Sequence, residues 1–328
     1  MELFFLPLIQ TMNKPFVSII IPAQNAQATL KKCLDSIVHL HYDSSQVIVV
    51  NDGSNDDTAA ILKNYPHIAV ITTEGKGPSY ARNLALKEAK GEFVAFTDAD
   101  CIVDSEWINE LLKGFEEETV AGVGGAQKSP ADDTPFGMLV QEFLFAFGFI
   151  SDYMHHGIHM RPTHHNPTCN TMYLRSVLLE MNGFLDGLWP GEDVELDYRI
   201  IKKGYRLMFN PAAIVFHYRP GAFAQYQRMM FRYGVAQGFL VRRYGFFRLV
   251  HFVPSALLLL MALFIFNARI GLLVFSIVLV ALLLKVLLQS KHPLSMIKLL
   301  AVTLISWNLG FVYGVSLASP QGAHRINV

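Results

Sequence analysis

Acidic residues are missing from the last 131 positions of this 328-residue chain, since all 27 aspartates and glutamates lie at or before Asp197. Of the 27 lysines and arginines, 12 lie in that first part and 15 after it, so the formal net charge of zero combines −15 with +15. A carboxylate-rich part suits a metal ion and a phosphorylated ligand, whereas a basic, apolar part suits a membrane with anionic lipids. The charge distribution therefore predicts an enzyme domain attached to a bilayer.

Cysteine is also scarce: the chain has three, Cys33, Cys101 and Cys169, and they are far apart in sequence. An odd number without a CxxC pair matches neither a disulfide framework nor a common zinc motif, and it favours a reducing compartment. Charged residues make up only 16% of the chain and hydrophobic residues 52%, with the excess after Leu249. This composition predicts one domain of about 200 residues followed by a membrane-embedded part.

The N-terminal residues 1–10 are apolar, but they lack the basic start and the small-residue cleavage site of a secretion signal and are too short to span a bilayer. We therefore expect residues 1–14 to be an extension and the active domain to stay untranslocated. Met12 is an alternative start of the chain.

Short β-branched runs alternate with helical patterns from residue 16 to about residue 126. Such alternation is typical of an α/β domain with a Rossmann-like, mainly parallel sheet and helices on both faces. The predicted strands are 17–22, 47–51, 68–72, 93–97 and 120–124, and the predicted helices are 30–40, 58–65, 79–89 and 106–115. Ligands of such sheets lie beyond the carboxyl ends of the strands. The candidate site residues at those ends are Ala23-Gln24-Asn25, Asn51-Asp52-Gly53-Ser54 and Asp98-Ala99-Asp100.

The second half of the chain consists of successive segments that differ in pattern and composition. After a less regular stretch, 128–170, the patterns predict strands 171–174, 206–209 and 214–216 and helices 176–181 and 192–203. Residues 221–248 interleave arginines with aromatic residues and methionines, which predicts an amphipathic segment in the membrane interface.

Three apolar stretches close the chain, and each is about the ~20 residues that a bilayer core demands. They cover residues 249–268, 270–288 and 294–317, within a membrane part of 249–318, and residues 319–328 form a tail. The flanking lysines and arginines predict that the catalytic part is cytoplasmic and that the C-terminus lies outside. Lys298, Asn308 and two glycines dilute the third stretch, so a re-entrant hairpin is the alternative there.

Several short motifs stand in a fixed order. They are 17–22 with Ala23-Gln24-Asn25, then Val49-Val50-Asn51-Asp52-Gly53-Ser54, Gly77-Pro78-Ser79-Tyr80-Ala81-Arg82-Asn83, Thr97-Asp98-Ala99-Asp100, residues 170–175, Asn182-Gly183-Phe184 and Gly191-Glu192-Asp193. In this order they resemble the family 2 nucleotide-sugar glycosyltransferases, which have a GT-A fold. The resemblance covers roughly residues 15–219 and implies a GT-A domain over residues 15–220.

Asp98 and Asp100 stand two apart after the apolar strand Phe93-Val94-Ala95-Phe96, so both carboxylates can reach the same face. Oxygen ligands at this spacing suit Mg²⁺ or Mn²⁺, which neutralises charge on a departing nucleoside diphosphate. The resemblance implies that Asp100 is the direct metal ligand, that Ala99 lies beside the donor, and that His217 completes the metal or diphosphate site. A solvated turn is the alternative for the two aspartates, and a packed strand-end side chain for His217.

The resemblance also implies that Asp52 reads the nucleoside, with an Asx-turn as the alternative. Lys76 and Arg82, at the start of a predicted helix, are candidate diphosphate or base contacts, because helix N-termini and cations favour anions. For Lys76 the alternative is an exposed side chain, and for Arg82 it is a surface pair with Glu88 or Glu92. The other residues that the resemblance assigns to nucleotide-sugar binding are Pro22, Ala23, Asn25 and Glu192.

Asp193 begins a predicted helix, where acids are ordinary partners of the helix dipole. The resemblance instead implies that Asp193 is the catalytic base, which takes a proton from the acceptor hydroxyl during an inverting displacement. The five histidines of residues 155–165 lack regular ligand spacing, so we expect a polar acceptor loop there rather than a zinc site.

Gln225 and Arg228 belong to a segment that resembles the QxxRW motif of processive polysaccharide synthases, and we assign them to the acceptor or diphosphate side. Met229 replaces the tryptophan, which removes an aromatic platform for a growing sugar chain and favours transfer of a single sugar.

These observations predict an inverting, metal-dependent glycosyltransferase that moves one sugar from a UDP- or GDP-sugar to a lipid-linked acceptor, in the plasma membrane of a bacterium or archaeon, without a nucleic-acid partner. A polyprenyl-phosphate sugar transferase, whose acceptor is the lipid phosphate itself, is the close alternative. A polysaccharide synthase, a nucleotidyltransferase and a non-enzymatic membrane scaffold are the others.

Overall fold

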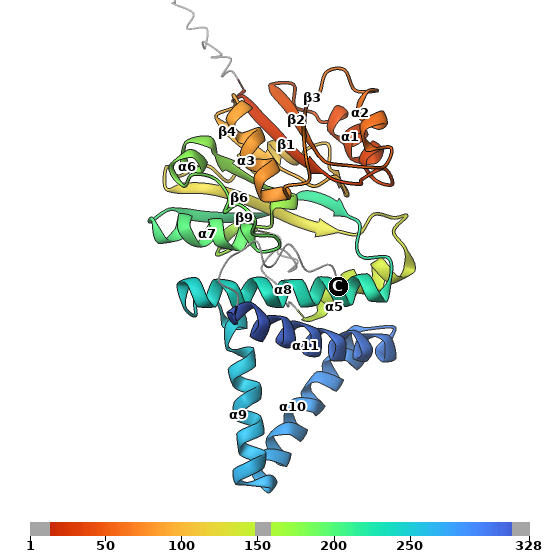
Figure 1. Cartoon of the computed structure of the whole chain (residues 1–328), viewed down its shortest axis with the longest axis vertical. Coiled ribbons are helices and arrows are strands. Elements are labelled where there is room, and N and C mark those ends of the chain that lie inside the picture. Colours follow the sequence, from red (N-terminus) through yellow and green to blue (C-terminus); the bar gives the residue numbers. More distant parts are fainter. Residues whose placement is uncertain (1–13, 148–158, 317–328) are drawn as a thin grey trace, which may run out of the picture.

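The computed structural model describes residues 14–147 and 159–316, which form an α/β domain above a helical part (Figure 1). The strands are β1 (Val17–Ala23), β2 (Ser45–Asp52), β3 (Ala69–Thr73), β4 (Phe93–Phe96), β5 (Cys101–Val103), β6 (Val120–Lys128), β7 (Arg161–Thr163), β8 (Thr171–Leu174) and β9 (Arg206–His217). They form a single sheet in the order β3-β2-β1-β4-β8-β6-β9-β5, with β7 paired to β9. The N-terminal extension and the C-terminal tail that the sequence predicts lie outside the described residues, except for Lys14.

Helices cover both faces of the sheet, as the alternating pattern predicts. They are α1 (Leu30–Val38), α2 (Thr58–Leu62), α3 (Pro78–Glu88), α4 (Trp107–Leu112), α6 (Arg175–Glu180) and α7 (Glu192–Lys202). Ile19 and Ile21 of β1 pack with α1 and α4, whereas Ile20 packs with α3, α6 and α7. This alternation follows from the period of two in a strand, and it explains why β1 is apolar on both faces.

Strands β3, β2, β1 and β4 run parallel, and Ala23 at the end of β1 lies opposite Asn51 near the end of β2. The predicted strand-end motifs are therefore neighbours at one edge of the sheet. Beyond β4 the sheet is mixed, because β8 is antiparallel to both β4 and β6.

Some elements differ from the sequence prediction. The predicted strands 206–209 and 214–216 are one continuous β9, whose register against β6 shifts between Gly125 and Ala126. Pro211 interrupts the strand pattern in the sequence, so two separate strands were predicted. The stretch 128–170, expected to be irregular, contains α5 (Pro135–Phe147) and β7, and the three-residue β5 was too short for its pattern to be recognised.

The helical part begins with α8 (Phe223–Tyr244), which runs beneath the sheet in the place of the predicted interfacial segment (Figure 1). It is followed by the 3₁₀ turn η3 (Leu249–Phe252), α9 (Val253–Phe266), α10 (Ala268–Gln289) and α11 (Pro293–Ser316). By length and composition, the described residues include three helices that can cross a membrane: Leu249–Phe266, Ala268–Leu288 and Pro293–Ser316. The prediction of three apolar C-terminal helices is confirmed.

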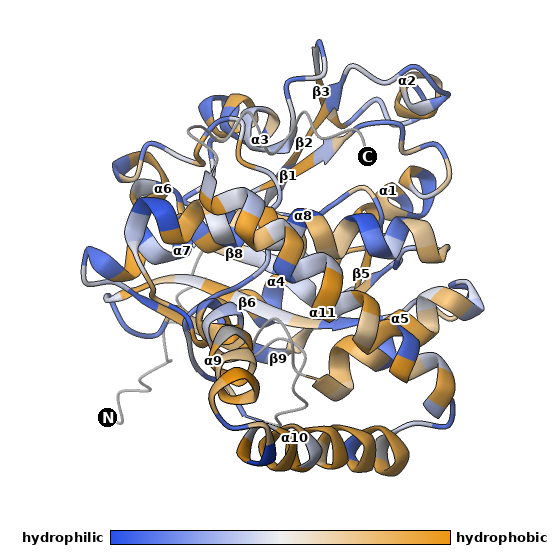
Figure 2. Ribbon diagram, turned by 60° about the horizontal axis from the view of Figure 1, so that its bottom comes forward, coloured by the Kyte–Doolittle hydropathy of each residue, from blue (hydrophilic) through white to orange (hydrophobic). Residues whose placement is uncertain are grey.

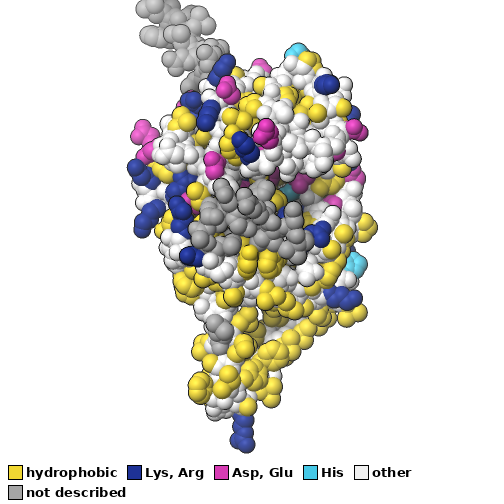
Figure 3. All heavy atoms as spheres, in the orientation of Figure 1, with side chains coloured by type: hydrophobic (Ala, Val, Ile, Leu, Met, Phe, Trp, Pro, Cys, Tyr) yellow, Lys and Arg dark blue, Asp and Glu magenta, His cyan; other side chains and the backbone are white. Residues whose placement is uncertain are grey.

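The three apolar helices are not equivalent in space. Helices α9 and α10 project away from the catalytic domain as a hairpin, whereas α11 runs along α8 (Figure 1). Figure 2 shows α10 as almost entirely hydrophobic, and Figure 3 shows hydrophobic side chains over the projecting hairpin. In α11, 39% of the apolar stretch is buried inside the protein, against 11% in α10.

Glycines explain how α11 packs so closely on α8. Gly234 and Gly238 of α8 lie against the backbone of α11, and Gly310 and Gly314 of α11 lie against the backbone of α8, so each helix carries one small-xxx-small pattern at the contact. A Cβ atom at Gly238 would lie 2.1 Å from a carbonyl oxygen of α11, and one at Gly310 would lie 2.1 Å from a carbonyl oxygen of α8. The glycines that dilute the third apolar stretch are therefore the residues that let two backbones touch.

Replacing Gly310 by leucine is expected to push α11 off α8, because no side chain fits between the two backbones. Overpacking of this kind costs about 1–3 kcal/mol. The variant should show a lower midpoint of thermal unfolding in detergent and faster proteolysis between α10 and α11. Ala301→Leu, at an exposed position of the same helix, is the matched control. Equal stability of the two variants would contradict this packing role.

Candidate active site

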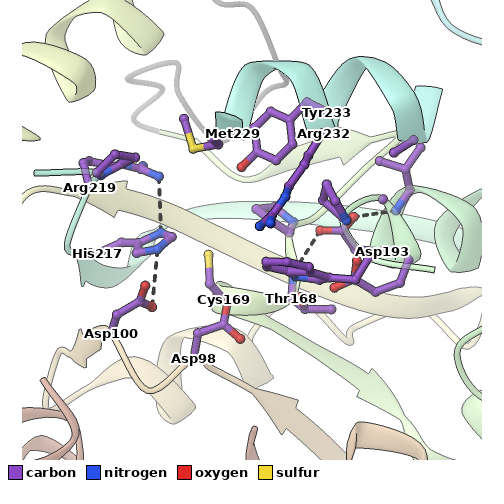
Figure 4. A pocket seen from close by; sticks show the side chains of 18 of the residues that line it. Asp98, Asp100, Thr168, Cys169, Asp193, His217, Arg219, Met229, Arg232 and Tyr233 are labelled. Carbon is purple, nitrogen blue, oxygen red and sulfur yellow. Dashed lines mark hydrogen bonds and ion pairs between the residues drawn. The ribbon is translucent and has the colours of Figure 1, made fainter. Parts of the chain in front are cut away.

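A cavity of about 790 Å³ lies between the sheet and α8. Asp98 and Asp100 line it on the sheet side, and Met229, Arg232 and Tyr233 of α8 line it on the opposite side (Figure 4). Eight of the site residues predicted from the sequence meet around it: Arg82, Asp98, Asp100, Glu192, Asp193, His217, Gln225 and Arg228.

Arg82 is the buried centre of this group. It is only 1% exposed, and its two terminal nitrogens donate to Asp98 Oδ1 and Glu192 Oε1, both at 2.7 Å. Burial raises the pKa of Asp98, although Arg82 opposes the shift. Burial and the neighbouring Asp193 raise the pKa of Glu192 to about 8. Arg82 thus joins two carboxylates from distant parts of the chain rather than pairing on the surface with Glu88 or Glu92.

Asp100 faces His217 because β5 follows it directly and pairs antiparallel with the end of β9. Asp100 Oδ1 lies 3.4 Å from His217 Nε2. Arg219 lies on the other side, with Nη1 3.2 Å from His217 Nδ1 (Figure 4). Burial favours the neutral imidazole, but Asp100 outweighs this effect and the pKa of His217 rises to about 10. The pairing of β5 with β9 therefore brings a histidine from far along the chain to the two aspartates.

Asp193 lines the cavity across from Asp98, in the first turn of α7. Its Oδ1 accepts the Val194 backbone N–H at 2.8 Å, and its Oδ2 lies 4.0 Å from His165 Nε2. The other ring nitrogen of His165 lies 2.9 Å from the fully buried Asp197. Asp197 also accepts a hydrogen bond from the Tyr173 hydroxyl at 2.6 Å. Burial raises the pKa of Asp197. The result is a carboxylate, imidazole and carboxylate in series, with one end open to the cavity.

The loop before Asp193 has to come close to α8. Gly191 has φ +98°, and a Cβ atom on it would lie 2.9 Å from Ala236 of α8. Only glycine combines this left-handed backbone with so little space. The Gly191-Glu192-Asp193 motif therefore fixes the distance between the catalytic domain and α8.

A second group of predicted residues lies at the ends of β1 and β2. The carboxylate of Asp52 is buried and accepts Thr73 Oγ1 and the backbone N–H groups of Lys76 and Gly77, at 2.7–2.9 Å. Asp52 therefore does not make the Asx-turn considered as its alternative, and it is Asn51 Oδ1 that accepts the Ser54 N–H, at 3.3 Å. Asp52 instead holds the loop that opens α3.

The remaining predicted residues do not line the cavity, and all of them except Ala99 sit around this loop. The side chain of Asn25 accepts the Asn55 N–H at 2.9 Å, and the ammonium group of Lys76 lies 4.9 Å from the centre of the Tyr80 ring. Pro22 and Ala23 end β1, and Ala99 is buried between the two aspartates. Ala28 and Thr29, which follow this group, do line the cavity and connect the two regions.

The α8 wall of the cavity is cationic. Arg228 and Arg232 both line it, and burial together with the charge of Arg228 lowers the pKa of Arg232. The Arg232 guanidinium lies 5.5 Å from the centre of the ring of Trp189, which lines the cavity from the loop before α7. The lining continues to Val250, at the start of the first apolar stretch, and to Trp307, which is buried within α11. The cavity therefore extends from the aspartates to the apolar C-terminal part of the chain.

The sequence model described as Glycosyl transferase family 2 matches residues 18–181, half of the chain. The chain belongs to glycosyl transferase family 2. The chain is accordingly a glycosyltransferase, and the family predicted from the motifs is confirmed.

Individual relatives agree with this assignment. The enzyme of Methanococcus voltae named "Dolichyl N-acetyl-alpha-D-glucosaminyl phosphate 3-beta-D-2,3-diacetamido-2,3-dideoxy-beta-D-glucuronosyltransferase" is 23% identical, over 85% of this chain and 90% of its own length. Glycosyltransferase AglE of Haloferax volcanii is 29% identical, over 69% of this chain and 74% of its own length.

The fold also matches a solved glycosyltransferase. Mannosyltransferase PcManGT from Pyrobaculum calidifontis, solved in complex with GDP-Man and Mn²⁺, aligns with a TM-score of 0.62 at 19% identity. The alignment covers 92% of this chain and 88% of the other. At this identity the likeness concerns the fold, and it confirms the GT-A architecture.

Several residues in and next to the cavity were not predicted from the sequence. Asp197 lies four residues after Asp193 and so shares its helix face, a signal that could have been found. His165 belongs to the group of histidines for which the sequence predicted a polar acceptor loop. Of that group, His155 and His156 lie outside the described residues. Nothing in the sequence distinguishes Arg219, because its role depends on the pairing of β5 with β9.

Proposed function

We propose that this glycosyltransferase moves a single sugar, with inversion, from a nucleotide-sugar donor to a lipid-linked acceptor held in the membrane. One observation carries the proposal: a single cavity has carboxylates on the sheet side, arginines on the α8 side and apolar helices at its end. A lipid-linked acceptor has a hydroxyl, an anionic phosphate and an apolar chain in the same order.

On the sheet side, Asp98, Asp100 and His217 would hold a divalent ion. Carboxylate oxygens with one imidazole suit Mn²⁺ or Mg²⁺, and PcManGT was solved with Mn²⁺. When bound, the ion supplies Lewis-acid stabilisation of the departing diphosphate. Arg82 keeps Asp98 in position and adds a buried positive charge next to it.

The donor is proposed to be a UDP- or GDP-sugar whose nucleoside lies near the ends of β1 and β2. Pro22, Ala23, Asn25 and the Asp52 loop form this region, which Ala28 and Thr29 connect to the cavity. Since both Asp52 oxygens are already hydrogen-bonded, its role is to hold the loop against which the nucleoside rests. PcManGT, the structural neighbour, was solved with GDP-Man.

On the acceptor side, Arg228 and Arg232 are proposed to bind the phosphate of the lipid. Guanidinium groups form charge-assisted hydrogen bonds to phosphate oxygens. The Methanococcus voltae relative is named for transfer to a dolichyl-linked sugar phosphate, which supports an acceptor of this class. Asp193 is then the base that accepts the proton of the attacking sugar hydroxyl, and His165 with Asp197 orients it.

In the membrane, α9 and α10 are proposed to cross as a hairpin while α11 stays in the interface along α8. The burial of α11 and its glycine contacts with α8 support this arrangement. The C-terminus would then lie on the same side as the catalytic domain, which we propose to be the cytoplasm, and not outside as three crossings would require.

Asp100→Asn is expected to reduce sugar transfer by about 10²-fold or more, since it weakens the metal that stabilises the leaving diphosphate. The wild type is screened with Mn²⁺ and a panel of UDP- and GDP-sugars. The true donor should raise its unfolding temperature, because a ligand stabilises the state that binds it. This shift should be lost in Asp100→Asn. Asp43→Asn, which changes an exposed carboxylate far from the cavity, is the control. Full transfer by Asp100→Asn would overturn the metal assignment.

A further inference from the structure

Two of the three cysteines meet one of the site residues at the edge of the cavity. Cys101, Cys169 and His217 offer ligand atoms that all lie within 4.8 Å of one another. Both cysteines are buried, and neither is part of a disulfide. Neither thiol has a role in the transfer reaction proposed above.

The fold brings the three side chains together by separate means. Cys101 in β5 stands directly opposite His217 in β9. Cys169 belongs to the 3₁₀ turn η2 (Thr168–Asn170), whose position is fixed by the Thr97 hydroxyl donating to the Cys169 carbonyl at 3.0 Å. The buried side chain of Asn170 anchors the same turn through hydrogen bonds to the Ala126 and Ala213 carbonyls. The cluster is therefore built on strands and a fixed turn.

A fourth ligand is already beside the cluster. Asp100 Oδ1 lies 3.4 Å from His217 Nε2 and 3.9 Å from Cys101 Sγ. With Zn–N and Zn–O bonds of about 2.0–2.2 Å and Zn–S bonds of about 2.3 Å, neighbouring ligand atoms of a tetrahedral zinc are about 3.3–3.8 Å apart. Small side-chain movements would therefore bring two sulfurs, one nitrogen and one oxygen to that geometry.

We propose that Cys101, Cys169, His217 and Asp100 form a second cation site, selective for a thiophilic ion such as Zn²⁺. Thiolate ligands select zinc and similar ions over Mg²⁺ and Mn²⁺, which prefer oxygen. Each thiol that is still protonated, and the His217 imidazolium, gives up its proton to the solvent when it binds the ion, so zinc binding releases protons.

This site shares Asp100 and His217 with the proposed catalytic metal, and the two ions therefore exclude each other. Zinc would inhibit sugar transfer by removing two ligands from the catalytic ion. The inhibition rests on the proposed function, whereas zinc binding to the four side chains does not.

Cobalt substitution tests the binding directly. The full chain in detergent, kept reduced, should develop sulfur-to-cobalt charge-transfer absorbance in the near ultraviolet on addition of Co²⁺, and Zn²⁺ should remove it. Cys101→Ser and Cys169→Ser should each lose about half of this absorbance, because each removes one of two thiolates. The double variant should lose all of it. Cys33→Ser removes the third thiol, which donates to the Asp98 carbonyl instead, and should keep the full band.

The inhibition is measured separately, as sugar transfer at fixed Mn²⁺ with increasing Zn²⁺. The double cysteine variant should need at least about tenfold more zinc for half-inhibition, since even groups that only hydrogen-bond to metal ligands change metal affinity by about 10- to 100-fold, and these two thiolates are ligands themselves. A wild-type chain without the charge-transfer band, or a band that survives in the double variant, would overturn the site. A band without zinc inhibition would leave the cation site in place and contradict only the sharing of ligands with the catalytic ion.

Discussion

Asp193→Asn is expected to lower kcat for transfer to a sugar hydroxyl by about 10²- to 10⁴-fold, the usual contribution of a general base. Asparagine keeps the size of the side chain and can still accept the Val194 N–H, but it cannot accept a proton. Donor binding should be unchanged, because Asp193 lies across the cavity from Asp98 and Asp100 (Figure 4). The measurement is kcat together with the donor-dependent shift in unfolding temperature.

The matched control is Asp186→Asn, in the loop before α7, where asparagine can still accept the Asn83 amide. It should transfer sugar at the wild-type rate. The same experiment separates the two acceptor classes, because a lipid phosphate is already anionic and needs no base. If Asp193→Asn still transfers sugar to a polyprenyl phosphate, the acceptor is the lipid phosphate itself and not a lipid-linked sugar.

Residues at strand ends were predictable from the sequence because their position follows from local patterns. The strand Phe93–Phe96 is buried throughout, so the two aspartates after it had to emerge at the sheet edge. The same reasoning located Asp52 at the end of β2. It predicted the position of Asp52 but not its partners, since the loop over Thr73–Gly77 that it holds is fixed by tertiary contacts. Gly53, whose added Cβ would lie 2.6 Å from the Gly75 nitrogen, shows how close this loop comes.

What the sequence could not show depends on pairings between distant segments. His217 reaches Asp100 only through the pairing of β5 with β9, and Cys169 reaches both through the turn η2. No regular spacing encodes such a cluster, and the separation of the three cysteines in sequence pointed away from a metal site. The glycines of α11 were similarly ambiguous, because their meaning depends on the partner helix and not on the hydropathy of α11 itself.

Arg82→Met is expected to destabilise the protein by about 3–5 kcal/mol, the usual cost of removing one partner from a buried ion pair. Methionine approximates the length of the side chain but leaves Asp98 and Glu192 without their shared cation. The loss should appear as a lower midpoint of chemical unfolding in detergent, and transfer should fall as well because Asp98 loses its anchor. Arg82→Lys should recover only part of the stability, since one ammonium lacks the planar fork that joins both carboxylates.

A surface arginine provides the matched control for this effect. Arg206 pairs with Glu117 where both side chains are 42–59% exposed, so Arg206→Met should cost no more than about 1 kcal/mol. Adding Glu192→Gln to Arg82→Met should restore part of the lost stability, because it removes one of the two buried carboxyl groups that are left without the arginine. If the double variant is no more stable than Arg82→Met alone, the cost comes from lost packing of the arginine stem, and the buried pair with Glu192 does not hold α3 to α7.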